Sequence, residues 1–193
     1  MNRCDWCGTD PLYVHYHDKE WGVPVHDDQI HFEFLVLESA QAGLSWITIL
    51  KKRENYRIAY KNFNAEAVAA FTEEDQVILL QNVGIVRNRL KIKASINNAK
   101  LFLQIQEEFG SFDAYLWKFV DGKPIVNSFE TIDELPAKTP LSEKISKDLK
   151  KRGFKFLGPT IMYAHLQAVG VINDHLLSCF RRQEILDQQH RSK

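Results

Sequence analysis

The sequence has few cysteines, and it has no apolar stretch of the length that spans a membrane. Nothing at its N-terminus is typical of a signal peptide, so we expect a cytoplasmic protein whose three cysteines are reduced. The absence of a long apolar run argues against an integral membrane protein and against a membrane partner. The formal net charge is zero, because 25 basic residues balance 25 acidic ones. This balance argues against broad, non-specific binding of polyanions, although it is compatible with a single basic face.

Strand-like alternation is nearly absent, and the chain has no internal repeat and no low-complexity linker. Apolar residues instead recur on a helical period through most of the sequence. At 193 residues the chain is long enough to bury a substantial core. We therefore expect one all-α domain over residues 1–187, followed by a frayed polar tail at residues 188–193.

Several helix boundaries carry local signals. Asn64, Thr72 and Ser111 lie where N-caps are expected, and Thr72 with Asp75 is typical of a capping box. The helices that the periodicity predicts cover residues 30–42, 44–60, 65–71, 73–81, 87–108, 111–120, 142–152, 158–169 and 173–187.

Four residues near the two ends of the chain form a candidate zinc site. Borderline-soft Zn²⁺ takes thiolate and imidazole ligands together, and two of each complete a tetrahedral site. The C-terminal pair is spaced i, i+4, so on a helix both side chains would project from one face. With every position filled by a protein ligand, the ion would be a structural clip that joins residues 4–17 to residues 175–179. The four residues are Cys4, His17, His175 and Cys179.

Spacing alone leaves other interpretations of these residues open. A free cysteine is often a small buried hydrophobe, and a lone histidine is often a satisfied core residue. Cys7 is a competing ligand, because Cys4 and Cys7 form a CxxC pair. A disulfide is the weaker alternative.

Residues 147–171 are typical of a helix, a short turn and a second helix. Gly153 is placed to end the first helix, and Gly158 with Pro159 and Thr160 is placed to begin the second. A glycine turn that opens into a helix exposes N–H groups at the positive end of the helix dipole, which suits a phosphate. An ordinary helical hairpin with a solvated basic face is the alternative. The surrounding cations are Lys150, Lys151, Arg152 and Lys155.

The first fifty residues are rich in tryptophan and tyrosine, whose flat faces bind planar ligands and whose polar edges form hydrogen bonds. Glu38 lies among apolar residues, where a carboxylate is costly unless it is paired or meets a ligand donor. A base flipped out of DNA could stack on Trp46 and a tyrosine while Glu38 accepts from its exocyclic amine. The alternative is that the aromatics belong to the core and Glu38 faces solvent. The candidate pocket residues are Trp6, Tyr13, Tyr16, Trp21, Glu38, Gln41 and Trp46.

Five segments with matching order and spacing carry a family resemblance that extends to about residue 180. They are CDW, DPLYVHYHDKEWGVP, FEFLVLESAQAGLSWITILKKRENYR, KKRGFKFLGPTIMYAHLQAVG and NDHLLSC. On these segments the chain resembles the DNA-3-methyladenine glycosylase I family, the bacterial constitutive alkylation-repair glycosylases of the helix-hairpin-helix superfamily. The resemblance implies a helix-hairpin-helix glycosylase fold and a substrate of double-stranded alkylated DNA. It also implies hydrolysis of the N-glycosidic bond of 3-methyladenine after base flipping, which leaves an abasic site.

The resemblance also implies roles for individual residues. The zinc ligands of the family fall on the two cysteines and two histidines given above, as one structural Zn²⁺, and leave Cys7 outside. Its base pocket falls on the aromatic cluster, with Glu38 as the recognition residue. Its helix-hairpin-helix motif falls on residues 142–170. The expected contacts to the DNA backbone are Gly153, Lys155, Gly158, Thr160 and Lys151.

One departure from the wider superfamily bears on mechanism. Many helix-hairpin-helix glycosylases carry an aspartate two residues before a histidine, shortly after the second hairpin helix. Here that position is Asn173, and His175 is assigned to the metal. The departure weighs against an aspartate that activates water or stabilises an oxocarbenium ion. Because alkylation makes the base cationic, and so a good leaving group, we hypothesise that Glu38 and the aromatics recognise the lesion. With no lysine placed for a Schiff base, we expect a monofunctional glycosylase.

Two other functions fit parts of the sequence. A zinc-clipped reader would bind modified bases or damaged DNA without cutting, and release of the base would distinguish it from an enzyme. A structural DNA-binding module would use only the hairpin, and it would leave Glu38 and the aromatics without a role. The sequence leaves open minor lesions such as 3-methylguanine and the oligomeric state, for which we expect a monomer. It also leaves open which residue wedges into the DNA stack, for which Leu44 and the turn that follows Gly43 are our candidates.

Overall fold

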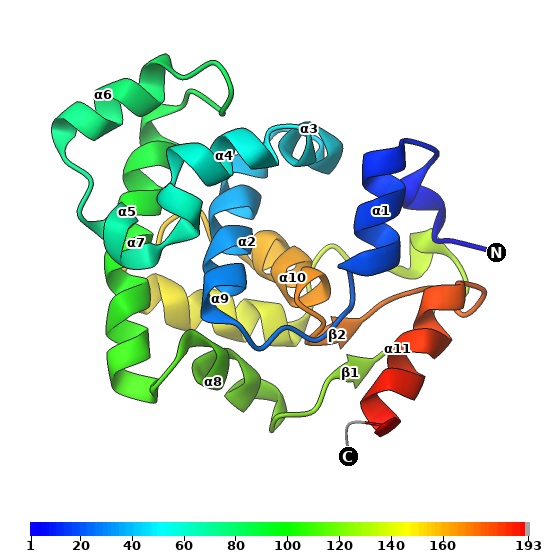
Figure 1. The fold of residues 1–193 in the computed structure, drawn as a ribbon. Coiled ribbons are helices and arrows are strands. Elements are labelled where there is room, and N and C mark those ends of the chain that lie inside the picture. Colours follow the sequence, from blue (N-terminus) through cyan, green and yellow to red (C-terminus); the bar gives the residue numbers. More distant parts are fainter. Residues whose placement is uncertain (192–193) are drawn as a thin grey trace.

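Helices joined by short turns make up most of the protein (Figure 1). The computed structural model describes residues 1–191. The prediction of a mostly helical protein is confirmed, and among these residues the strands are limited to one parallel pair, β1 (Ile125–Val126) with β2 (Ile172–Asn173). No helix in this part of the chain is long and apolar enough to cross a membrane. The helices are α1 (Pro11–Lys19), α2 (Asp28–Gln41), α3 (Trp46–Leu50), α4 (Arg53–Ala59), α5 (Ala65–Ala69), α6 (Glu73–Gln81), α7 (Arg89–Phe109), α8 (Phe112–Trp117), α9 (Pro140–Arg152), α10 (Pro159–Ala168) and α11 (Phe180–Arg191).

Helix α2 lies at the centre of the molecule, and α7, α8 and α10 pack around it (Figure 1). Every residue from 31 to 40 is buried, so the helix is enclosed on all sides. Its buried polar residues His31, Glu33 and Glu38 each hydrogen-bond a side chain from another element. Glu38 is only 2% exposed and therefore does not face solvent.

The local signals at the helix ends are confirmed. Asn64, Thr72 and Ser111 each accept a hydrogen bond from a backbone N–H in the first turn, and Thr72 forms the expected capping box with Asp75. Gly153 ends α9 with φ 101°, and Gly158 is the N-cap of α10. Glycine suits the first of these positions because the left-handed region is costly for residues with a Cβ.

Two predicted boundaries in the N-terminal third differ from the structure. The single helix expected over residues 44–60 is divided into α3 and α4 by a turn at residues 51–52, and no glycine or proline marks this break. Helix α1 is not among the predicted helices, although Asp10 caps it and Pro11 opens it. Its sequence mixes apolar and polar residues, and only Tyr16 and His17 are buried. That leaves little apolar periodicity to detect.

The C-terminal region differs more. In place of one helix over residues 173–187, β2 extends through Asn173, an irregular turn follows, and α11 begins at Phe180. His175 and Cys179 therefore converge through a turn and do not share a helical face. The frayed tail predicted at residues 188–193 is helical as far as Arg191, and residues 192–193 lie outside the described part of the chain.

The segment of residues 21–25 links α1 to α2 and crosses the C-terminal end of α10. The N–H of Gly22 donates to the carbonyl of Gln167 at 2.9 Å, and the N–H of Val25 donates to that of Val169 at 3.0 Å. Gly170 has φ 67°, and a Cβ on it would lie 2.3 Å from the backbone nitrogen of Pro24. The close crossing fixes α1, α2 and α10 relative to one another.

Candidate functional site

A cavity of about 230 Å³ lies among α1, α2, α3 and α10. The structure brings all seven predicted pocket residues to its wall. Four further lining residues were not predicted, because they are unexceptional residues of a loop without periodicity and of the apolar helix α10. They are Ile132, Leu135, Ala164 and Gln167.

The aromatic side chains of the cavity are in mutual contact. The ring of Trp6 lies 5.0 Å from that of Tyr13 and 4.9 Å from that of Trp21, and Tyr16 lies 5.5 Å from Trp46, measured between centroids. Tyr13 and Tyr16 are one turn apart on α1 and so share a face. The indole Nε1 of Trp46 is buried, and no group in the described residues accepts its hydrogen. A ligand acceptor at that position would satisfy a donor that is otherwise costly to bury.

Glu38 is held at the cavity by a single buried partner. Its Oε2 lies 2.9 Å from Nδ1 of His165, which projects from α10 and is fully buried. Burial raises the pKa of Glu38 well above its usual value, and burial lowers the pKa of His165 to about 3. Both groups are therefore most stable in their neutral forms, with the proton on Glu38. His165 was not predicted from the sequence, because a lone histidine in an apolar helix gives no signal of its own.

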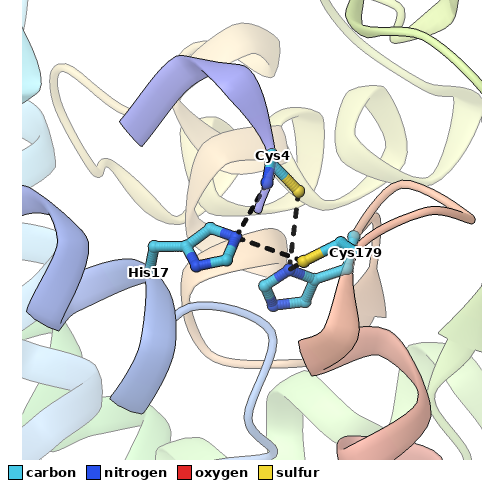
Figure 2. A group of neighbouring side chains, drawn as sticks. Cys4, His17 and Cys179 are labelled. Atoms are coloured by element: carbon cyan, nitrogen blue, oxygen red, sulfur yellow. Dashed lines mark hydrogen bonds between the residues drawn. The ribbon is translucent and has the colours of Figure 1, made fainter. Parts of the chain in front are cut away.

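The four candidate metal ligands meet in one buried cluster, although they come from opposite ends of the chain. Figure 2 shows Cys4, His17 and Cys179 of this cluster pointing toward one another. Their ligand atoms all lie within 4.8 Å of one another. The Sγ of Cys179 is 3.4 Å from Nε2 of His17 and 3.4 Å from Nδ1 of His175, and the Sγ of Cys4 is 3.6 Å from that Nδ1. Tetrahedral zinc, with bonds of about 2.3 Å to sulfur and about 2.0–2.1 Å to nitrogen, separates these atoms by about 3.6 Å.

Hydrogen bonds behind the cluster orient both imidazoles toward it. Nδ1 of His17 lies 2.8 Å from Asp18, and Nε2 of His175 donates to the carbonyl of Trp21 at 2.9 Å. The hydrogen bond from Arg3 lowers the pKa of Asp18 to about 2 against the effect of burial, so Asp18 is ionised and accepts from His17. Each ring therefore presents its unprotonated nitrogen to the cluster, as a metal ligand must.

The thiols of the cluster also suit a cation. Their mutual hydrogen bond lowers the pKa of Cys179 and raises that of Cys4. Cys7 is buried nearby but does not belong to the group that can hold a metal. All three cysteines are free thiols, so the disulfide alternative is excluded.

The predicted hairpin lies between α9 and α10 and is fastened to α7. The side chain of Asn98 binds both the N–H and the carbonyl of Lys155, at 2.9 and 2.8 Å, so that N–H is not available to a ligand. The N-cap of α10, Gly158, provides no side-chain cap, unlike those of α1, α2 and α5 to α9. The first intrahelical acceptor is the Gly158 carbonyl, bonded by Met162, so the N–H groups of Thr160 and Ile161 have no acceptor within the helix.

The cations around the hairpin divide into two kinds. Lys150, Lys151 and Lys155 are exposed and make no ion pair within the described residues. Arg152 instead pairs with Glu108 at 2.6 Å and with Asp148 at 2.9 Å. The lysines are therefore the cations available to an anionic ligand.

Known proteins resemble this chain along nearly its whole length. A family model described as methyladenine glycosylase matches residues 6–182. The DNA-3-methyladenine glycosylase 1 of Escherichia coli (strain K12) is 50% identical over 179 residues, which are 93% of this chain and 96% of that protein. The DNA-3-methyladenine glycosylase of Haemophilus influenzae (strain ATCC 51907 / DSM 11121 / KW20 / Rd) is 46% identical over 177 residues, 92% and 96% of the two chains. A structure on 3-methyladenine recognition by 3-methyladenine DNA glycosylase I from Staphylococcus aureus is similar with a TM-score of 0.91. It is 41% identical and covers 94% of this chain and 97% of that one.

Proposed function

The chain belongs to the methyladenine glycosylase family, and we propose that it removes 3-methyladenine from alkylated double-stranded DNA. The enzyme hydrolyses the N-glycosidic bond of the flipped nucleotide, releases the free base and leaves an abasic site. The observation that carries this proposal is the aromatic cavity that ends at the buried carboxyl group of Glu38. The enzyme acts as a monomer built on one α-helical domain.

The size and lining of the cavity suit a single modified base. Its volume of about 230 Å³ is below the roughly 300–1,000 Å³ typical of sites for drug-sized ligands. Tyr16 and Trp46 offer ring faces to a planar ligand, and Gln41 and Gln167 add amide groups at the wall. A positively charged base gains further from the π faces, by about 0.5–2 kcal/mol per contact depending on its desolvation.

Charge complementarity selects the lesion. The buried carboxyl of Glu38 is neutral in the empty pocket, but a cationic base at hydrogen-bond distance favours its ionised form. The resulting carboxylate accepts from the base, and a charge-assisted hydrogen bond contributes about 1.5–3 kcal/mol. Extrusion of a nucleotide costs a few kcal/mol, so this contact is of the size needed to hold a flipped base.

The reaction does not require an activating aspartate. Asn173 is fully buried, and its Oδ1 accepts from the N–H of His175, which is a structural role in the turn. The carboxylate of Asp174 already accepts from Asn127, Tyr163 and Gln167. The positive charge of the alkylated base weakens the glycosidic bond by itself. Addition of water then gives the neutral free base, an abasic sugar and one proton, so the protein has chiefly to extrude and hold the base.

The cluster of two cysteines and two histidines holds one structural Zn²⁺ in this proposal. The donor atoms and the orientation of both imidazoles fit the ion, as the distances above indicate. Four protein ligands leave no position for an activated water, so the ion contributes cohesion and takes no part in hydrolysis. It would connect the first residues of the chain to the turn that precedes α11.

The hairpin acts as a helix-hairpin-helix anchor for the DNA backbone. The uncapped N-terminus of α10 directs the N–H groups of Thr160 and Ile161 outward, and a phosphate satisfies them. Lys151 and Lys155 lie exposed beside the turn and add positive charge. These contacts carry no sequence information, which suits an enzyme that must find a lesion in any sequence.

Release of methylated bases from DNA treated with a methylating agent tests the proposal. The products are separated by chromatography, with untreated DNA as the control. We expect release of 3-methyladenine and retention of the unmodified bases. Binding of the treated DNA by folded protein without release of any base would identify a reader and refute the enzymatic assignment.

A further inference from the structure

Two buried histidines, His165 and His31, and the partly exposed Asp113 continue from Glu38 toward the surface. His31 and Glu38 are seven residues apart on α2 and therefore lie on the same side of that helix. His165 bonds Glu38 through Nδ1, and its ring lies 5.9 Å from that of His31 between centroids. Nε2 of His31 lies 3.2 Å from Asp113 on α8, and the same carboxylate lies 3.1 Å from Nδ1 of His26. The side chain of His26 is 60% exposed, so the series of groups reaches solvent.

The hydrogen-bonded series is interrupted between His165 and His31. On each side of this gap a ring nitrogen lacks a hydrogen-bond partner within the described residues. Nε2 of His165 and Nδ1 of His31 are buried and have no partner within the described residues. Each is the nitrogen opposite to the one that carries the existing hydrogen bond. Buried water characteristically occupies sites where it bonds two or more such groups. One water molecule between the two rings would satisfy both atoms and complete a continuous path.

We propose that Glu38, His165, His31 and Asp113 form a buried proton path through which Glu38 gives up its proton when a cationic base enters the cavity. This inference rests on the proposed function, because it requires a cationic base as ligand. His165, His31 and Asp113 are positioning residues, since they set the charge of Glu38 and do not touch the base.

The transfer is balanced at each atom. The O–H bond of Glu38 breaks as Nδ1–H of His165 forms. Nε2–H of His165 breaks as its proton passes through the water to Nδ1 of His31. Nε2–H of His31 then breaks, and that proton passes to Asp113 and His26 and leaves to solvent. One proton departs for each cationic base bound, no electrons move, and Glu38 becomes the carboxylate that the base requires.

The surroundings favour this direction of transfer. Burial opposes a charge on His31, while its hydrogen bond with Asp113 favours one. Burial raises the pKa of Asp113, but hydrogen bonds and charge from His31 and His26 outweigh burial and lower it, so Asp113 is the fixed negative charge of the path. Three other ionisable groups lie near the path. Tyr16 on α1 faces Glu38, and Asp28 on α2 accepts a hydrogen bond from the backbone N–H of Asp113. Lys91 on α7 donates to the carbonyls of residues 40 and 42 at the end of α2.

The test is the pH dependence of single-turnover release of 3-methyladenine from methylated DNA, compared between wild type and Asp113→Asn. Asparagine keeps the size of the side chain and an acceptor for His31, but it removes the charge and cannot pass on a proton. Because a like charge raises the pKa of a carboxyl group, loss of the Asp113 charge should move the acidic limb of the profile down. The plateau rate of release should fall by about tenfold, because the proton of Glu38 no longer has a route through Asp113.

Two further variants make the outcome specific. His31→Gln keeps a donor toward Asp113 but interrupts the path, so it should show the same fall in the plateau rate. Asp75→Asn removes the same charge from the capping box of α6 and should leave the profile unchanged. Plateau rates of Asp113→Asn and His31→Gln that coincide with wild type would overturn the path. Absence of release by wild-type protein would instead refute the proposed function.

Discussion

Replacing Glu38 with glutamine should abolish most excision while leaving the fold intact. Glutamine has nearly the same volume and keeps one acceptor oxygen, but it cannot become a carboxylate. The lost charge-assisted hydrogen bond is worth about 1.5–3 kcal/mol, and each 1.4 kcal/mol is a factor of ten. Single-turnover release of 3-methyladenine should therefore fall roughly 10- to 150-fold. Near-normal release by folded Glu38→Gln protein would refute the assignment of Glu38.

Glu38→Gln, which lowers excision, should increase the stability of the folded protein near neutral pH. Burial raises the pKa of Glu38 in the folded state above the value of 4.5 expected when it is exposed. The folded state therefore binds this proton more tightly, and that contribution to stability is complete below pH 4.5 and is lost as the pH rises through the folded-state pKa. Glutamine has no such dependence. Thermal unfolding should show Glu38→Gln gaining stability relative to wild type as the pH increases from 5 toward 8.

A second buried glutamate on the same helix provides the matched control. Glu33 accepts from Arg53 at 2.7 Å and from Arg57 at 2.8 Å, so its charge is paired within the protein. Breaking a buried pair costs about 3–5 kcal/mol, and because both arginines are partly exposed we expect roughly 2–3 kcal/mol for Glu33→Gln. That loss lowers the melting temperature by about 4–12 °C. Excision well below the melting temperature should be retained. Equal destabilisation by the two substitutions would contradict the view that Glu38 is kept for the ligand.

Three other substitutions test the remaining features. Cys179→Ala should lower metal content and melting temperature together, while Cys7→Ala retains the metal; loss of metal without a change in melting would rule out a clip. Both Gly170 and Gly110 have positive φ, so alanine strains the backbone at either position. In Gly170→Ala the new Cβ would also lie 2.3 Å from backbone atoms, and we expect the folded protein to lose roughly 2–5 kcal/mol of stability. Gly110→Ala meets nothing within 4 Å and should cost only about 1–2 kcal/mol. Equal shifts in thermal unfolding would contradict that reasoning. Lys151→Gln should weaken binding to damaged and undamaged DNA alike and reduce the salt slope by about 1 in fluorescence titrations; an unchanged slope would exclude a phosphate contact.

The sequence predicts those residues of the site whose side chains are energetically costly to bury without a partner. A buried carboxylate, as at Glu38, and cysteines and histidines that are paired at the chain ends are costly or unusual without a partner, so their type and position make them candidates. The three-dimensional arrangement of the site is harder to predict from the sequence. His175 and Cys179 converge through a turn that their helical spacing did not indicate. His165 and Ile132 reach the site only because α10 and a loop pack there, and nothing local distinguishes them from other histidines and isoleucines.

The candidate metal cluster and the cavity are in direct contact, and in the proposed function only the cavity contacts substrate. The ring of Trp6 lies 5.3 Å from that of His17, and the ring of Trp21 lies 4.6 Å from that of His175, so cavity aromatics pack directly on candidate metal ligands. The carbonyl of Trp21 also fixes the tautomer of His175. Helix α1 buries little apolar surface of its own, with only Tyr16 and His17 inside the protein. A short helix of this kind is marginal without a tertiary anchor. If the proposed metal is bound, it therefore supplies the rigidity that the aromatic wall of the cavity needs. Its removal should then weaken binding of the base, even though the ion takes no part in hydrolysis.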